Sequence, residues 1–141
     1  MRVRHHTLLG FDYGTRRIGV AVGQHVTGSA TALETLTTRN GKPDWPRIEA
    51  LIRDWQPDAL VVGIPYHMDG SEQPMTEASR RFARQLHGRY GLPVYEADER
   101  LTSYEAERLL AAEGSRDDDR VDALAARLIL EDWLRNEASD A

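Results

Sequence analysis

Three carboxylates in this chain stand where their type and surroundings could support chemistry. Asp12 lies in the apolar run LLGFDYG, Glu99 follows the short run VYEA, and Asp122 opens the apolar stretch VDALAARLIL. A carboxylate in hydrophobic surroundings is costly unless something pairs with it. Three hard oxygen ligands without cysteine or clustered histidine suit Mg²⁺ or Mn²⁺ rather than zinc. Such ions can activate water and stabilise the leaving oxygen in phosphodiester hydrolysis, so the three residues predict a metal site of that kind.

Each carboxylate also has a purely structural explanation. Asp12 at the end of a strand could accept backbone N–H groups in an Asx turn. Glu99 could be a solvated strand end with Arg100 as its local ion partner. Asp122 is favourable in the first turn of a helix because the helix dipole attracts negative charge there. Taken one at a time, these residues leave both explanations open.

The elements that must position the three carboxylates follow the order of an α/β protein. Alternating or continuous apolar runs predict strands over residues 7–13, 18–22, 30–39, 59–64 and 94–97. Helices are predicted over about 45–56, 76–90, 102–113 and 121–134. This order implies an antiparallel hairpin unit continued by βα crossovers, which gives a mixed five-stranded sheet with helices on both faces. Ligand sites of such sheets lie at the carboxyl ends of the strands.

Local signals refine this outline. Asp44 is predicted to cap the first helix, and Ile48, Leu51, Ile52 and Trp55 form its apolar stripe. Gly14 and Gly19, in the turn that follows Asp12 and in the next strand, suit a close approach of backbone or ligand, although DxGxxxxG is a weak motif alone.

Composition restricts the functional classes. The chain has 141 residues, 40% of them hydrophobic, and a net charge of −5, which predicts one globular domain over residues 1–141. No apolar run approaches the roughly 18 residues of a membrane span, and no targeting signal is recognised, so we expect a cytoplasmic protein without membrane contact. The absence of cysteine excludes a thiolate nucleophile or a zinc–thiolate site. Of the 18 cations only Lys42 is a lysine, which reflects either a biased genome or a use of arginine on phosphate.

Four segments, taken together and in order, resemble the signatures of the YqgF-type family, also called RuvX. They are FDYGTRRIGVAVG (11–23), VVGIPYHMDGSEQP (61–74), DERLTS (98–103) and VDALAARLIL (121–130). The resemblance runs from about residue 7 to 135. It implies a ribonuclease H-like fold similar to that of Holliday-junction resolvases. It also implies processing of the 5′ end of the small-subunit (pre-16S) ribosomal RNA precursor, the role proposed for the family.

The resemblance further implies roles for individual residues. Asp12, Glu99 and Asp122 become the metal-binding catalytic carboxylates, the same three that the residues themselves indicate. Arg16 and Arg17 are placed near the scissile backbone, and Arg100 either joins them or braces Glu99.

Other charged positions leave alternatives open. Arg80, Arg84 and His87 share a helix face, which is either solvated or a basic rim that tracks a nucleic-acid strand. His67 stands where the family commonly has asparagine, which alters a loop contact rather than a metal ligand. The acidic run 117–119 stands where the family has a neutral or basic loop and should repel phosphate. Within it Asp119 is a helix N-cap or, less expectedly, a fourth carboxylate.

The sequence therefore predicts a nuclease dependent on Mg²⁺ or Mn²⁺ that acts on structured RNA, with branched DNA as the alternative substrate. Ribosomal precursor particles are the expected partners, and the protein could act as a monomer or a homodimer. Two other classes compete with this interpretation. The turn after Asp12 also resembles the phosphate hairpin of actin-like ATPases, which need two such lobes. A noncatalytic nucleic-acid or ribosome-binding module would fit the negative charge but not the presence of three carboxylates.

Overall fold

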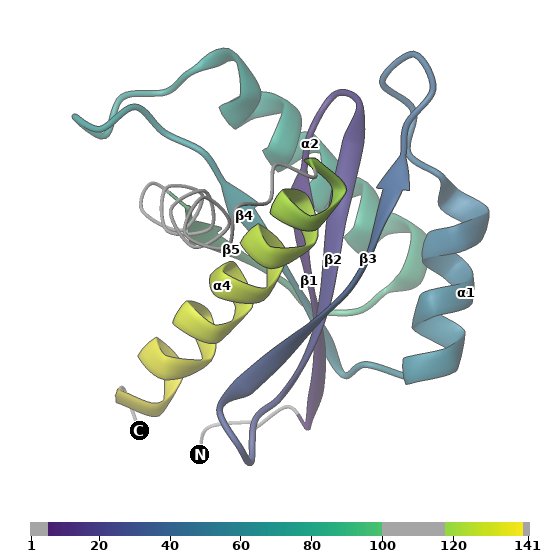
Figure 1. The fold of residues 1–141 in the computed structure, drawn as a ribbon, viewed down its shortest axis with the longest axis vertical. Helices are drawn as coiled ribbons and strands as arrows, with labels where there is room; N and C mark the ends of the chain where they lie inside the picture. The colour runs from purple at the N-terminus through teal and green to yellow at the C-terminus, as the bar shows by residue number, and fades with distance from the viewer. Residues whose placement is uncertain (1–5, 100–117, 140–141) are drawn as a thin grey trace.

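The fold is a five-stranded mixed sheet with helices against both faces (Figure 1). The structure, a computed structural model, describes residues 6–99 and 118–139. The strands are β1 (Thr7–Tyr13), β2 (Arg17–Gln24), β3 (Ser29–Thr37), β4 (Ala59–Ile64) and β5 (Val94–Asp98), in the spatial order β3-β2-β1-β4-β5. β1 pairs antiparallel with β2 and parallel with β4, which pairs parallel with β5. The predicted mixed sheet is confirmed.

Helices from separate parts of the chain cover the two faces. α1 (Trp45–Trp55) and α2 (Pro74–Tyr90) pack on one face, and α4 (Asp118–Ser139) runs across the other (Figure 1). The helix predicted over 102–113 lies outside the described residues. Among the residues that are described, no helix has the length and apolarity needed to span a membrane.

The two faces of the sheet carry side chains of different size. Because side chains alternate along a strand, one face collects Leu9, Phe11, Ile18, Val20, Leu60 and Val62, which form a core with Phe82 of α2 and Ile48 of α1. The face toward α4 carries small residues at the alternate positions, among them Gly10, Gly19, Ala21, Ala59 and Gly63. This small-residue face lets α4 lie close against the strands.

Gly19 is where this close approach matters most. A Cβ atom built at Gly19 would lie 1.9 Å from the backbone oxygen of Asp122, so the group that approaches this glycine is the first turn of α4. Gly14 has a different role, since a Cβ there would lie 2.8 Å from the carbonyl oxygen of Arg17 within the turn itself.

We expect Gly19→Ala to destabilise the protein by about 2 kcal/mol or more, because α4 must shift to avoid overpacking. Gly88→Ala is the matched control. Gly88 lies inside α2, a Cβ there meets nothing within 4 Å, and Ala should stabilise the helix by roughly 0.5–1 kcal/mol. Urea unfolding of both variants measures the difference. Equal free energies of unfolding would contradict the tight contact between β2 and α4.

The start of α1 confirms the predicted cap, but the last residue of its predicted apolar stripe is not buried. The Asp44 carboxylate accepts the Arg47 backbone N–H at 3.1 Å. Ile48 and Leu51 are buried in the core, but Trp55 is 42% exposed. The apolar stripe therefore packs only over its first two turns, and the prediction that Trp55 belongs to it is wrong. The helix ends there because Gln56 adopts a left-handed conformation with φ of 48°.

Candidate active site

Asp12 and Glu99 meet at the carboxyl edge of the parallel strands. Asp12 is the penultimate residue of β1, and Glu99 directly follows β5, where its backbone N–H extends the ladder to the Ile64 carbonyl at 3.2 Å. β4 lies between these two strands. A Cβ at Gly63 of β4 would lie 2.4 Å from Glu99 Oε2, so the glycine leaves the space that the Glu99 carboxylate occupies on the α4 side.

The two carboxyl groups interact directly. Burial, then the negative charge and hydrogen bond of Glu99, and then the charge of Asp122 raise the pKa of Asp12 well above its usual value. Burial is also the main reason that the pKa of Glu99 rises to about 7, helped by the charge of Asp98 and opposed by the hydrogen bond from Asp12. Near neutral pH the pair therefore keeps a proton that two separate carboxyl groups would release, and this proton is shared in the hydrogen bond between them. A pair that cannot carry both negative charges unaided is a place where a cation is stabilised.

The third predicted carboxylate faces a cation of this chain. Asp122 lies in the first turns of α4, and its Oδ2 accepts a hydrogen bond from Arg17 Nε at 2.7 Å. Arg17 begins β2, so the pair joins the β1–β2 turn to α4 across the sheet edge. The Arg17 side chain is 35% exposed and that of Asp122 is 24% exposed, which makes this a partly desolvated ion pair.

Removing Arg17 is expected to weaken the charge compensation of Asp122, which lies near the Asp12 carboxyl group. Arg17→Met should lower the free energy of unfolding by about 1–2 kcal/mol at pH 8 in EDTA. Arg47→Met provides the control, because Arg47 forms a more exposed pair with Glu34 at 2.6 Å, and its loss should cost clearly less than the loss of Arg17. Parallel denaturation curves measure both. An equal loss in the two variants would show that the pair at α4 is an ordinary surface contact.

The residues present fit a divalent cation, although Asp122 is placed differently from Asp12 and Glu99. Within residues 6–99 and 118–139, no three side chains of metal-binding type already form a chelating group. Asp12 and Glu99 lie together, and Asp122 lies near enough to raise the pKa of Asp12 while bonding to Arg17. Oxygen donors that crowd like charges are the donor set that Mg²⁺ and Mn²⁺ prefer.

Comparison with known proteins places this geometry in a family. The model of a family described as "RuvX: Holliday junction resolvase" matches residues 6–136. The chain belongs to the RuvX family. A relative from Azotobacter vinelandii, named "Putative pre-16S rRNA nuclease", is 59% identical over 130 residues, which are 90% of this chain and 92% of the relative. A relative of the same name from Pseudomonas aeruginosa (strain LESB58) is 60% identical and covers 90% of each chain.

Solved structures confirm the fold of this RuvX chain. T. thermophilus RuvC in complex with a Holliday junction substrate aligns with a TM-score of 0.58 at 20% identity, over 97% of this chain and 98% of RuvC. The fowlpox virus Holliday junction resolvase aligns with a TM-score of 0.58 at 8% identity, over 93% and 99% of the two chains. At these identities the likeness concerns the fold, which is ribonuclease H-like as predicted.

The structure separates the predicted basic residues of the RuvX chain. Arg16 is exposed in the β1–β2 turn beside Arg17, at the carboxylate edge. Arg100 lies outside the described residues. Arg80, Arg84 and His87 belong to α2, which packs on the face opposite α4, so the structure does not bring them to the three carboxylates.

Each of these α2 side chains has a local partner. Arg80 Nη1 contacts Glu72 Oε1 at 3.1 Å, and Arg80 Nη2 donates to the Tyr66 hydroxyl at 2.7 Å. Arg84 Nη2 pairs with Glu77 at 2.8 Å. His87 Nδ1 contacts the Leu92 carbonyl oxygen at 2.9 Å, at the end of the helix. These partners lower the positive charge that the predicted rim offers to a phosphate backbone, and the role of the rim in binding stays a prediction.

Three further positions that the sequence analysis singled out are Asp119, Asp117 and His67. The backbone is already helical at Asp118, so Asp119 is inside α4 and the N-cap predicted for it is wrong. The side chain of Asp119 and all of Asp117 lie outside what the structure describes. His67 is exposed in the loop between β4 and α2, where its backbone N–H bonds to the Ser71 carbonyl at 2.9 Å.

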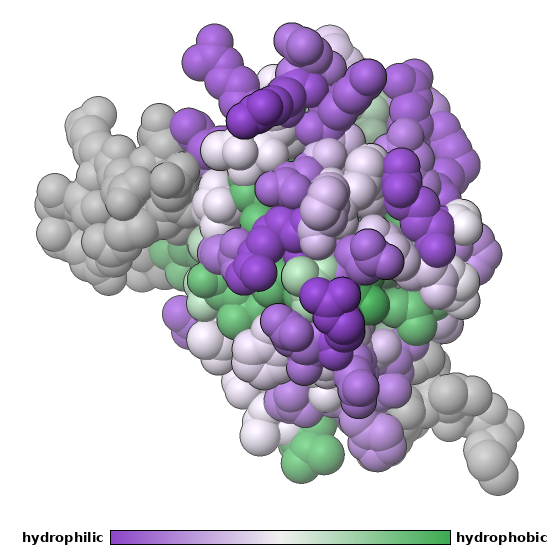
Figure 2. All heavy atoms as spheres, turned by 90° about the vertical axis from the view of Figure 1, so that its right-hand side faces the viewer, coloured by the Kyte–Doolittle hydropathy of each residue, from purple (hydrophilic) through white to green (hydrophobic). Residues whose placement is uncertain are grey.

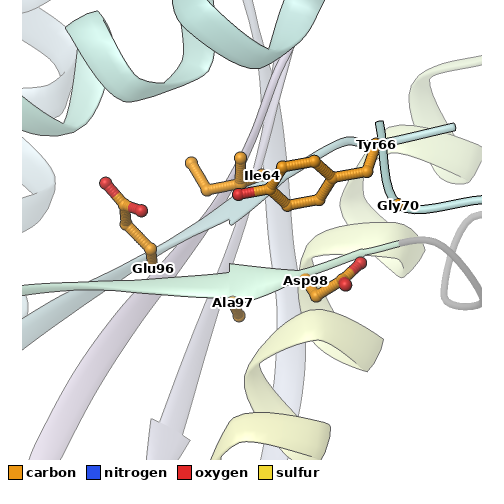
Figure 3. A pocket seen from close by; sticks show the side chains of 6 residues that line it. All are labelled: Ile64, Tyr66, Gly70, Glu96, Ala97 and Asp98. Carbon is orange, nitrogen blue, oxygen red and sulfur yellow. The ribbon is translucent and has the colours of Figure 1, made fainter. Parts of the chain in front are cut away.

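A separate cavity of about 490 Å³ is lined by residues of β5, by the end of β4 and by the loop between β4 and α2. Figure 3 shows that Glu96 and Asp98 project to the side of β5 on which Tyr66 lies, whereas Ala97 points the other way. Two carboxylates line this cavity, and one of them, Glu96, has Arg80 Nε at 3.9 Å from its Oε1.

Sequence reasoning missed the role of Gly63. The signal was available, because small residues recur at every second position of β2, as Gly19, Ala21 and Gly23, and stand at two alternate positions of β4, Ala59 and Gly63. That pattern is typical of a sheet face that receives a closely packed helix and leaves space for side chains from its edge.

Proposed function

We propose that this protein is a divalent-metal-dependent nuclease that hydrolyses phosphodiester bonds near the 5′ end of pre-16S ribosomal RNA. The observation that carries the proposal is the Asp12–Glu99 pair, a partly buried and a buried carboxyl group that share a proton at the carboxyl edge of a ribonuclease H-like sheet. The relatives named for pre-16S rRNA, about 60% identical over 90% of the chain, support the substrate. Such an enzyme would work in the cytoplasm on ribosomal precursor particles.

The chain's own residues have distinct tasks in this proposal. Asp12 and Glu99 would hold Mg²⁺ or Mn²⁺, with Asp122 as the adjacent third carboxylate. A divalent ion bound there would supply a nucleophilic hydroxide from water and stabilise charge on the leaving oxygen. The proton that Asp12 shares with Glu99 leaves when the pair gains positive charge, so both groups then act as anionic ligands.

Arginine supplies the complementary charge. Arg17 lies against Asp122, and Arg16 precedes it in the turn that directly follows β1, the strand that carries Asp12. Guanidinium groups bind phosphate oxygens with two parallel hydrogen bonds and keep their charge at all working pH values. We assign Arg16 and Arg17 to orient the scissile phosphate and to stabilise the charge that develops on it.

Resolution of branched DNA is the second candidate. It is favoured by the description of the matching family and by the fold shared with RuvC solved on a junction. Paired, symmetric cuts in a four-way junction require a symmetric dimer, whereas trimming of an RNA end requires only one copy.

A side-by-side cleavage assay with Mn²⁺ tests the function. It offers the protein labelled pre-16S RNA and a labelled four-way DNA junction, with an EDTA lane for each. We expect cutting of the RNA near the mature 5′ end and none of the junction. Symmetric cutting of the junction alone would replace the proposed substrate with branched DNA. Binding of nucleic acid without any cutting would contradict the nuclease and favour a binding module.

A further inference from the structure

The loop between β3 and α1 folds into a two-residue hairpin that displays two cations. The backbone N–H of Arg39 bonds to the Lys42 carbonyl at 3.1 Å, and that of Lys42 bonds to the Arg39 carbonyl at 2.9 Å. Asn40 and Gly41 between them have φ values of 53° and 75°, which is the left-handed pair of a tight hairpin turn. Residues that exchange both bonds lie opposite each other with their side chains on one face. Arg39 and Lys42 are both exposed.

The hairpin is anchored at the same edge as the carboxylates. The Tyr13 hydroxyl, one residue beyond Asp12, donates to the Gly41 carbonyl at 3.3 Å. Thr38 donates its backbone N–H to the Arg16 carbonyl at 2.9 Å and its hydroxyl to the Thr15 carbonyl. Figure 1 shows this loop at the upper end of the molecule, level with the β1–β2 turn and the start of α4. The two cations therefore have a fixed position relative to the candidate active site.

The cationic side chains of the hairpin and of the β1–β2 turn differ from several other cations of the chain in whether they form ion pairs. Across the described ranges 6–99 and 118–139, no ion pair involves Arg16, Arg39 or Lys42, whereas Arg47, Arg80 and Arg84 pair with glutamates. A polyanion is thus attracted along the sheet edge toward the hairpin.

The surface beside the hairpin is hollowed. A cavity of about 460 Å³, within the size range of ligand pockets, is lined by Thr37, Arg39, Asn40, Lys42 and the beginning of α1. Its one carboxylate, Asp44, accepts the Arg47 backbone N–H as the helix cap. Figure 2 views the α1 side, and strongly hydrophilic side chains gather at its upper end, the height at which the hairpin lies.

We propose that Arg39 and Lys42 bind the sugar–phosphate backbone of the nucleic acid, so that the strand runs from the carboxylates across the β1–β2 turn to the hairpin. This inference rests on the proposed function for the identity of the ligand. It assigns the backbone contact to the β3–α1 loop rather than to α2. The contact is electrostatic, so it strengthens binding to all sequences and to both RNA and DNA.

Binding of labelled pre-16S leader RNA, followed by fluorescence anisotropy in EDTA at several KCl concentrations, tests the proposal. For Arg39→Gln/Lys42→Gln we expect a dissociation constant about tenfold higher at low salt and a slope of log K against log salt that is smaller by about 2. Arg53→Gln/Arg135→Gln is the matched control. It removes the same charge at the opposite end of the molecule and should stay within about twofold of wild type. The charge-preserving Arg39→Lys/Lys42→Arg variant should keep the wild-type slope.

The outcomes separate this inference from the nuclease itself. Unchanged binding by the hairpin variant, an equal loss in the control, or no binding by the wild type would overturn the inference. If the hairpin variant still cleaves with an unchanged KM, the nuclease stands and the hairpin site falls. If no substrate is cut but RNA binding shows the expected slope change, the hairpin site stands and the nuclease falls.

Discussion

Asp12→Asn is expected to abolish metal-dependent cleavage and, in the same protein, to raise stability. Cleavage should fall by about a thousandfold or more, because a metal bound by carboxylates contributes several kcal/mol of transition-state stabilisation. The free energy of unfolding at pH 8 in EDTA should rise by about 1–2 kcal/mol, since the wild-type pair must take up a proton on folding at this pH and the amide removes that cost. Loss of activity through misfolding would show the opposite change in stability.

Single-turnover cleavage and urea denaturation, made on the same preparations, measure the two effects. Glu96→Gln is the matched control. Glu96 lies on β5, the strand that leads to Glu99, but its side chain projects to the side of β5 opposite to Ala97 (Figure 3). It should cleave at close to the wild-type rate. If Asp12→Asn kept its activity, Asp12 would not be a catalytic carboxylate. If the variant were inactive but less stable than wild type, the inference that the two carboxyl groups of the pair disfavour each other's negative charge would be wrong.

The stability of the metal-free protein is expected to fall as the pH rises. Because the folded protein raises the pKa of Glu99 from 4.5 to about 7, the native state keeps a proton that the unfolded chain releases between these values. The native state then binds more protons than the unfolded state, so the free energy of unfolding decreases through this window. The loss amounts to about 3 kcal/mol at most for Glu99, and the raised pKa of Asp12 adds to it.

Divalent metal should reverse this slope. Metal binding requires both carboxylates to be deprotonated, so the stabilisation by Mn²⁺ grows with pH as the apo protein weakens. Melting temperatures from pH 4.5 to 8, in EDTA and in Mn²⁺, measure both slopes. The double variant Asp12→Asn/Glu99→Gln should show neither slope, while Glu96→Gln should show both. A metal-free protein whose stability rises from pH 4.5 to 7 would contradict the shared proton.

The sequence predicts the Asp12–Glu99 pair because strand order follows from local patterns. Asp12 and Glu99 each come at the end of an apolar run, and the βα connections make the two strands parallel, which sets their carboxyl ends on one edge. The strand 59–64 was predicted to the residue because ALVVGI is a continuous apolar run that a central strand requires. These features depend on residues close together in the chain.

Other features depend on packing between distant segments. The Arg17–Asp122 pair joins residues 105 positions apart, and the depth at which α4 docks on Gly19 decides it. The partners of Arg80 and Arg84 were not predicted from the sequence either. Their spacing on α2 fits a nucleic-acid rim as well as a solvated face. Glu72 pairs with Arg80 only once the loop before α2 is folded, whereas Glu77 pairs with Arg84 within α2 itself. Arg39 was predicted only as the last residue of the strand over 30–39, and Lys42 was noted only as the single lysine.

Calorimetric titration of Mn²⁺ into the metal-free protein at pH 8 tests most directly whether this carboxylate pair is a metal site. The wild type and Glu96→Gln should bind Mn²⁺ with the same affinity and release protons, and Asp12→Asn and Glu99→Gln should each weaken binding by about tenfold or more. Binding that is unchanged in Asp12→Asn, or absent in the wild type, would contradict the assignment of Asp12 and Glu99 as metal ligands.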